Sequence, residues 1–108
     1  MSRQHILVVE DHPDMIGFYD RLLRQASQKG HLSYSLARTV PEARGILKRE
    51  TIDIIILDLM LPGISGLDFL RELRACPERR AILIIVVTAR CLAQDCAEAL
   101  AAGAADFL

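Results

Sequence analysis

The sequence predicts an α/β fold in which helices wind on both faces of a five-stranded parallel sheet. Three continuous runs of aliphatic residues carry this prediction, at residues 6–9, 54–57 and 82–87. Runs of this kind without polar alternation are typical of strands buried on both faces, as in parallel sheets. The segments between them have helical periodicity, so strands and helices alternate along the chain.

The first helix is predicted to follow Pro13, which suits an early helical position, and to stop near Gly30. Its apolar residues recur at the i, i+3, i+4 spacing of one apolar stripe. The stripe comprises Met15, Phe18, Tyr19, Leu22, Leu23 and Ala26. Residues 32–37 alternate weakly between apolar and polar, which predicts a second, edge-like strand.

A second helix is predicted where Thr39 and Glu42 have the spacing of a capping box, with Pro41 in the first turn. We expect it to end near Glu50. Its inward residues are Ala43, Ile46 and Leu47.

Residues 59–66 form a predicted loop, because proline and two glycines interrupt them. A third helix follows and stops before Pro77. Its inward residues are Leu67, Phe69, Leu70 and Leu73. A fourth helix is predicted over residues 92–102, closed by Gly103, and residues 105–108 are predicted to open a fifth strand.

Right-handed crossovers leave few topologies for this alternation, and the common strand order for five strands is 2-1-3-4-5. In that order strands 1, 3 and 4 are neighbours, and their carboxyl ends meet at one edge of the sheet. Asp11, Asp58 and Thr88 follow these three strands. The sequence therefore predicts that they converge on one crevice, where open α/β sheets bind ligands.

Composition limits the function classes. The 108 residues suffice for a single domain over 1–108, and 52% of them are hydrophobic. The net charge of −1 gives no basis for nucleic-acid binding by this segment. No apolar stretch reaches membrane-span length and the polar start is not a secretion signal, so we expect a cytoplasmic protein without membrane contact.

The predicted crevice gathers mutually repelling carboxylates. At an effective dielectric constant near 20, one carboxylate pair in contact costs about 4 kcal/mol. A cation offsets this repulsion, and all-oxygen ligands favour Mg²⁺ or Mn²⁺. Asp58 is then the candidate nucleophile, because an aspartate can accept a phosphoryl group as an acyl phosphate. Thr88 offers a hydroxyl to a phosphoryl oxygen, and the small Ala89 leaves room for the donor.

Four motifs occur in order along the chain. They are the Glu10-Asp11 pair, the loop from Asp58 through Gly63 with Gly66, the Thr88-Ala89 pair, and the segment 103–107. Together the motifs resemble the receiver domain of two-component response regulators over essentially the whole chain. The resemblance implies a flavodoxin-like doubly wound sheet and a protein that catalyses only its own phosphorylation and dephosphorylation.

The resemblance implies that Asp58 accepts a phosphoryl group from a histidine kinase or phosphotransfer protein. It implies that Asp11, Asp58 and the backbone carbonyl of Met60 bind Mg²⁺ directly, and that Glu10 acts through water. Thr88 would move toward the phosphoryl group.

The resemblance also assigns tuning positions. Phe107 would be the switch aromatic of the family, although a plain core phenylalanine is an alternative interpretation. Met60 and Arg90 occupy the variable positions that flank the site and influence the lifetime of the phosphoryl group. By hypothesis, Arg90 screens that group from water.

The sequence departs from the family pattern at its end. Receivers carry a lysine about three residues after the switch aromatic and then a fifth helix, whereas this chain stops one residue after Phe107. We therefore expect a truncated receiver; the alternative is that the lysine is absent and switching is compromised. The output domain is expected to lie outside the chain and to be DNA-binding, with a stand-alone receiver or an enzymatic output domain as the alternative. Homodimerisation on phosphorylation is a further expectation.

The alternative from another class is a receiver-like docking or dimerisation module that takes no phosphoryl group. The three repelling acids favour the phosphorylated switch. Spacing in the sequence excludes a GxSxG hydrolase elbow and a Walker loop. His5, His12 and His31 lack partners at ligand spacing and are predicted to be ordinary surface residues.

Overall fold

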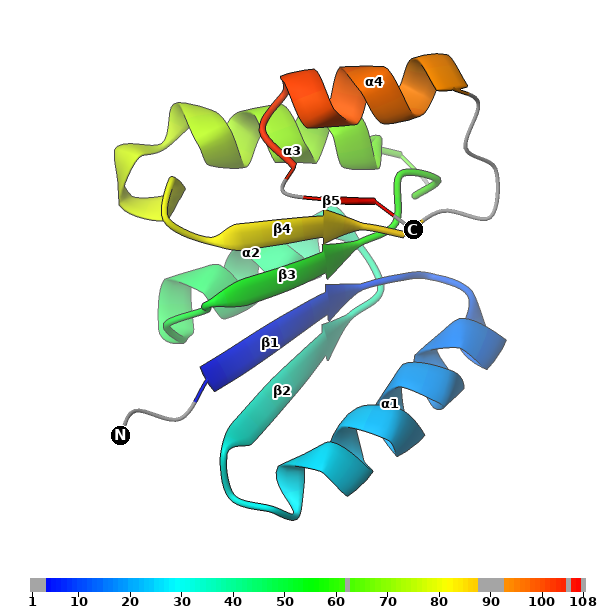
Figure 1. Ribbon diagram of the computed structural model, residues 1–108, viewed down its shortest axis with the longest axis vertical. Helices are drawn as coiled ribbons and strands as arrows, with labels where there is room; N and C mark the ends of the chain where they lie inside the picture. Colours follow the sequence, from blue (N-terminus) through cyan, green and yellow to red (C-terminus); the bar gives the residue numbers. More distant parts are fainter. Residues whose placement is uncertain (1–3, 62, 88–92, 105, 108) are drawn as a thin grey trace.

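A computed structural model describes residues 4–61, 63–87, 93–104 and 106–107. Its centre is one parallel five-stranded sheet in the order β2-β1-β3-β4-β5 (Figure 1), which confirms the predicted fold class and strand order. The strands are β1 (Gln4–Val9), β2 (Leu32–Ala37), β3 (Ile54–Leu57), β4 (Leu83–Val86) and β5 (Asp106–Phe107).

Four α-helices and a short 3₁₀ segment connect the strands. They are α1 (Pro13–Ser27), α2 (Val40–Arg49), α3 (Gly66–Ala75), η1 (Pro77–Arg79) and α4 (Ala93–Ala101). Only η1 has no counterpart among the predicted elements. None of the helices in the described ranges is both long and apolar enough to span a bilayer.

The register of the sheet determines what meets at its carboxyl edge. Val9 of β1 pairs with Leu57 of β3, and Leu57 pairs with Val86 of β4. The three strands therefore end side by side, and the residues that follow them lie at the same edge of the sheet. This edge is where the acids after β1 and β3 come together.

Two apolar layers cover the sheet because successive strand residues point to opposite faces. The larger layer packs α2, α3 and α4 against one face, and Phe69, Leu70 and Leu73 of α3 are fully buried in it. The smaller layer packs α1 against the other face through Tyr19 and Leu23. Burying each of these large side chains stabilises the fold by about 1.5–3 kcal/mol.

The apolar stripe of α1 is only partly buried against the sheet. Tyr19 and Leu23 are buried, but Met15, Phe18 and Leu22 are 36%, 48% and 50% exposed. A helix lying on a sheet contacts it along a narrow strip, whereas the apolar residues of α1 spread over a wider arc. The outer part of that arc is a solvent-facing apolar surface.

The predicted cap of α2 forms, with one change. The Thr39 hydroxyl accepts a hydrogen bond from the Glu42 backbone N–H at 3.2 Å. The Glu42 carboxylate accepts from the backbone N–H of Arg38 at 2.7 Å, one residue before the expected partner. One hydrogen bond therefore runs from the helix to the Thr39 side chain and one from the preceding backbone to the Glu42 side chain, as in a capping box.

The Arg74 guanidinium joins three segments of backbone. Its Nε donates to the carbonyl of Gly103 at 3.0 Å, and Nη1 donates to the carbonyl of Arg80 at 2.9 Å and of Arg79 at 3.4 Å. Gly103 has a φ of 114°, which favours glycine. Arg74 thus ties the end of α3 to the segments that lead into β4 and β5.

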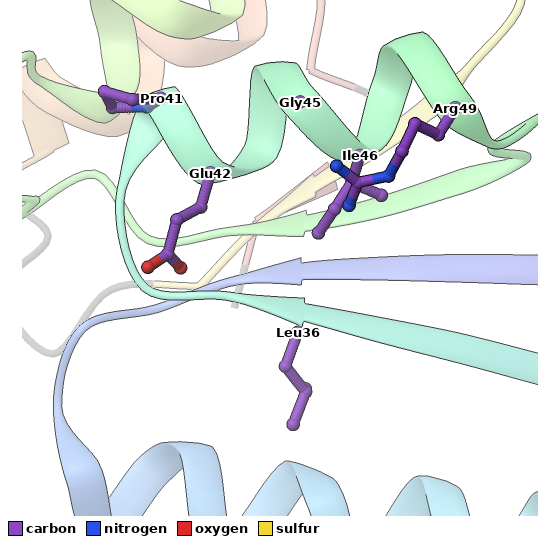
Figure 2. A pocket seen from close by; sticks show the side chains of 6 residues that line it. All are labelled: Leu36, Pro41, Glu42, Gly45, Ile46 and Arg49. Carbon is purple, nitrogen blue, oxygen red and sulfur yellow. The ribbon is translucent and has the colours of Figure 1, made fainter.

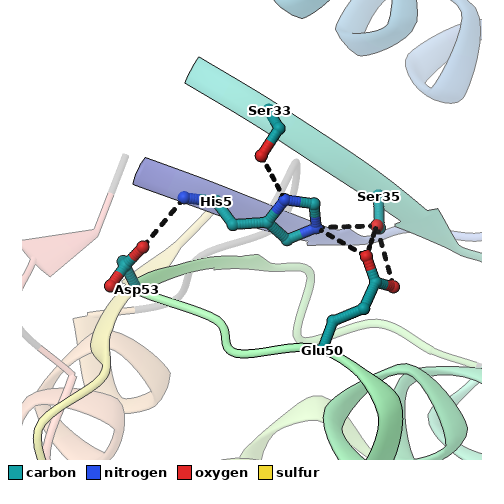
Figure 3. A network of polar contacts seen from close by, with 5 residues as sticks. All are labelled: His5, Ser33, Ser35, Glu50 and Asp53. Carbon is teal, nitrogen blue, oxygen red and sulfur yellow. Dashed lines mark hydrogen bonds and ion pairs between the residues drawn. The ribbon is translucent and has the colours of Figure 1, made fainter. Parts of the chain in front are cut away.

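His5 is not the isolated surface residue that the sequence predicts. Figure 3 shows its ring between β2 and the end of α2. Nδ1 is hydrogen-bonded to the Ser33 hydroxyl, while Nε2 lies 2.8 Å from Ser35 Oγ and 3.0 Å from Glu50 Oε1. Its backbone N–H donates to Asp53 at 2.9 Å. The prediction fails because these partners are distant in sequence.

Candidate functional site

Three carboxylates meet at the carboxyl edge of the sheet. Glu10 and Asp11 directly follow β1, and Asp58 directly follows the adjacent β3. One oxygen from each of the three side chains lies within 4.8 Å of the other two. The structure therefore brings together the acids that the sequence places in one crevice.

Backbone hydrogen bonds continue the sheet into this site. The Asp58 N–H donates to the Val9 carbonyl at 3.1 Å, and the Glu10 N–H donates to the Ala37 carbonyl at 2.9 Å. Asp58 Oδ1 also accepts from the Met60 N–H at 3.0 Å. The Asp58 carboxylate is consequently oriented by its own loop.

Gly66 permits that loop to close. Its N–H donates to the Leu59 carbonyl at 3.1 Å. A Cβ at this position would lie 2.2 Å from the Asp58 carbonyl oxygen and 2.6 Å from the Leu59 Cα. The sequence identifies Gly66 as a loop breaker, but only the structure shows that α3 begins against the backbone of Asp58 and Leu59.

Burial and charge act together on Glu10, which is 6% exposed. Burial raises its pKa above the ordinary 4.5, and the neighbouring Asp58 and Asp11 raise it further, against an opposing hydrogen bond from the His12 backbone. The pKa of Tyr19 is also raised, first by burial and then by the charges of Glu10 and Asp58. The site is therefore a concentrated region of negative potential.

His12 has a role at the site that the sequence did not predict. Its backbone N–H donates to Glu10 Oε1 at 3.0 Å, and its Nδ1 accepts from the Asp14 N–H at 3.3 Å. His12 is thus the N-cap of α1 and orients Glu10 at the same time. The sequence feature that could have indicated this N-cap is the position of His12 directly before Pro13, where a helix is predicted to start.

The remaining predicted site residues are placed as follows. Thr88, Ala89 and Arg90 lie outside the described residues. Met60 is 57% exposed on the loop after β3. Phe107 lies in β5, where its backbone pairs with Val86 of β4.

The donor set of the acid cluster suits a hard divalent cation. All three groups are carboxylates, and such oxygens are preferred by Mg²⁺, Mn²⁺ and Ca²⁺ rather than by softer metals. The raised pKa of Glu10 reflects, after burial, the repulsion that a bound cation relieves. The residues present therefore fit a magnesium ion.

Replacing Glu10 with Gln is expected to raise the melting temperature of the metal-free protein at neutral pH. The folded-state pKa of Glu10 lies above the unfolded value, so its contribution to stability is complete below about pH 4.5. That contribution is lost as pH rises through the folded-state pKa. The Glu10→Gln variant cannot ionise, so its advantage should grow with pH over this interval.

Thermal melts in EDTA between about pH 4 and pH 8 measure this difference. The exposed Glu78→Gln provides a matched control that removes one carboxylate elsewhere. Parallel melting curves for Glu10→Gln and the wild type at every pH would contradict the assignment of an ionisation cost to Glu10.

Comparisons with known proteins agree with this architecture. Residues 6–108 match the response regulator receiver domain family. The chain is 37% identical over 108 residues to the response regulator protein PilR of Pseudomonas aeruginosa, covering 100% of this chain and 23% of PilR. It is 35% identical over 104 residues to the transcriptional regulatory protein MalR of Bacillus subtilis, covering 96% of this chain and 43% of MalR.

A solved structure of a response regulator receiver protein from Pseudomonas putida superposes with a TM-score of 0.89 at 30% identity. The match covers 100% of this chain and 86% of that chain. The chain spans less than half the length of PilR and MalR. Because the family match covers nearly every residue, the chain belongs to the response regulator receiver domain family of two-component signalling proteins.

Proposed function

We propose that this chain is a phosphorylation-controlled switch in which Asp58 accepts a phosphoryl group from a histidine kinase or phosphotransfer protein. The observation that carries the proposal is the cluster of Glu10, Asp11 and Asp58, whose oxygens lie within 4.8 Å of one another. Family membership adds that receivers are signalling domains rather than classical enzymes. The chain would catalyse only its own phosphorylation and dephosphorylation.

In the proposed transfer, a carboxylate oxygen of Asp58 attacks the phosphorus and forms an acyl phosphate. The bond between phosphorus and the donor histidine nitrogen breaks, and its electron pair stays on the imidazole. The Met60 N–H, 3.0 Å from Oδ1, orients the attacking carboxylate. Thr88 would donate its hydroxyl to a phosphoryl oxygen, and the small side chain of Ala89 would leave space for the incoming donor.

Asp11, Asp58 and the carbonyl of Met60 would hold Mg²⁺, with Glu10 acting through water, and Mn²⁺ could replace it. A bound divalent ion supplies positive charge where phosphoryl oxygens and carboxylates meet. Glu10 is buried, and its Oε1 accepts a hydrogen bond from the His12 N–H, so its side chain would be held in place beside the ion.

We further propose that phosphorylation changes the surface near Phe107 and so controls an output domain or partner, most simply a transcriptional one. The similarity to MalR, which is named as a transcriptional regulatory protein, supports that choice. Homodimerisation on phosphorylation and a cytoplasmic location belong to the same proposal. The family's usual pairing with a histidine kinase supports the donor.

Incubation with acetyl phosphate and Mg²⁺ tests the proposal on the intact protein. The wild type should gain the mass of one phosphoryl group, and hydroxylamine should remove it because acyl phosphates are labile to this nucleophile. EDTA should suppress the gain. A protein that gains no mass under any donor, including phosphoramidate, would instead be the docking module of the alternative interpretation.

Replacing Arg90 with Ala is expected to shorten the lifetime of the phosphorylated protein. The proposal gives this cationic side chain the role of excluding water from the phosphoryl group, so its removal should speed hydrolysis about two- to tenfold. Decay of the phosphorylated mass after removal of acetyl phosphate measures the rate. Arg80→Ala, at another arginine, is the control, and equal decay in all three proteins would remove Arg90 from the mechanism.

A further inference from the structure

The outer edge of β2 is open in the part of the chain that the structure describes. β2 pairs only with β1 and is the last strand on its side of the sheet. The carbonyls of His31 and Ala37 accept hydrogen bonds from β1-side residues, at 3.2 and 2.9 Å. Because these groups alternate along a strand, the N–H and C=O groups of Leu32, Tyr34 and Leu36 face outward.

This edge lacks the devices that usually protect a sheet. Natural edge strands carry charged residues, proline or bulges that block pairing with another strand. The six residues of β2, from Leu32 to Ala37, include no charged residue, proline or glycine. The edge is therefore a competent template for a further strand.

The sequence of β2 is symmetric about Tyr34. From Leu32 to Leu36 it is Leu-Ser-Tyr-Ser-Leu, the same in both directions. A two-fold interface requires a self-complementary surface. We propose that β2 pairs with β2 of a second copy of this chain, antiparallel and with the two-fold axis at Tyr34.

The outward-facing groups match this register. Tyr34 would oppose the same residue of the second copy, and Leu32 would oppose Leu36. These are the residues whose N–H and C=O groups face the open edge, so each pair exchanges two hydrogen bonds. Among symmetric registers, the one centred on Tyr34 pairs all three outward-facing residues.

Side-chain chemistry is also matched across the axis. Leu32, Tyr34 and Leu36 pack on the α1 face of the sheet with Val8, Tyr19 and Leu23. The Tyr34 hydroxyl donates to Asp20 of α1 at 2.7 Å, which holds that side chain in place. The pairing would join the α1-side apolar layer of one copy to the same layer of the second copy. The hydroxyls of Ser33 and Ser35 lie on the opposite face of the sheet.

A groove of about 380 Å³ beside this edge supplies charge complementarity. Figure 2 shows Glu42 and Arg49 of α2 on its wall, with Glu42 toward the carboxyl end of β2 and Arg49 toward the other end. Both side chains are exposed. Antiparallel pairing turns the second copy end for end, so Glu42 of each copy would face Arg49 of the other.

Arg49 is available for such a pair. In the described ranges its guanidinium forms no ion pair, and it lies over Gly45 at 3.7 Å from where a Cβ would stand. The dimer would be one continuous sheet in which the two acid clusters lie at opposite ends. Asp58 follows β3 and not β2, so this pairing does not require phosphorylation and is separate from the dimerisation on phosphorylation in the proposed function.

Sedimentation velocity over a concentration series tests the proposal. The wild type should shift from monomer to dimer as concentration rises. Leu36→Pro should remain monomeric, because proline removes an outward N–H while an edge strand tolerates it. Leu36→Ala is the matched control, because it removes the same side chain but keeps the N–H, and it should still dimerise.

A monomeric wild type at every concentration would overturn the proposal, as would a dimer that persists in folded Leu36→Pro. Orientation has its own test. Arg49→Glu and Glu42→Arg should each dimerise poorly alone, but their equimolar mixture should form the heterodimer in native mass spectrometry, since both charge pairs are restored. Circular dichroism verifies folding, and failure of the mixture to restore pairing would exclude the antiparallel arrangement.

Discussion

Asp58→Asn is expected to abolish phosphoryl uptake from acetyl phosphate. The amide has nearly the same shape as the carboxylate and can still accept the Met60 N–H, so the loop should keep its geometry. It lacks the anionic oxygen that attacks phosphorus and forms the acyl phosphate. The loss should therefore be complete within detection, and intact mass measures it directly.

The same substitution at Asp68 is the matched control. Asp68 lies at the start of α3, is exposed, and is outside the acid cluster. Asp68→Asn should take up phosphoryl at close to the wild-type rate. If Asp58→Asn gained the same mass as the wild type, another residue would be the acceptor and the role given to Asp58 would be wrong.

Gly66→Ala is expected to destabilise the protein by about 3 kcal/mol or more. The added methyl group would lie 2.2 Å from the Asp58 carbonyl oxygen. The nearby atoms are backbone atoms that cannot rotate away as a side chain can. Either α3 must withdraw from the sheet or the loop carrying Asp58 must shift, so the variant should also bind Mg²⁺ more weakly.

Gly17→Ala separates this steric effect from the general effect of losing a glycine. Gly17 lies inside α1, where a Cβ would meet only the end of the Arg21 side chain at 3.6 Å. Alanine there should stabilise the helix by about 0.5–1 kcal/mol. Urea denaturation measures the free energy of unfolding of both variants. If Gly66→Ala were as stable as Gly17→Ala, the loop after β3 would accommodate the added methyl group without loss of stability.

Much of the fold is predictable because local patterns and tertiary packing agree. The aliphatic runs before Glu10 and Asp58 become adjacent parallel strands. Right-handed crossovers leave few strand orders, and the observed order is the common one among them. The convergence of the acids then follows from topology alone. Their roles in phosphoryl transfer are the part that experiment must decide.

The features that the sequence could not predict depend on contacts between distant segments. The partners of His5 come from β2 and α2, so no spacing near residue 5 reveals them. Phe18 and Leu22 continue the apolar period of α1, yet the width of the contact with the sheet leaves them exposed. Periodicity identifies a helix but does not determine how much of its circumference is covered.

The Arg74 guanidinium has a consequence for folding kinetics. Its bond to the Gly103 carbonyl joins residues 29 positions apart, across the whole of β4 and α4. We expect this contact to form after the rate-limiting step, because long loops must close and α4 must dock before the carbonyl is in place. Interactions absent from the transition state act mainly on the unfolding rate. Arg74 is therefore a residue that prolongs the lifetime of the native state without hastening its formation.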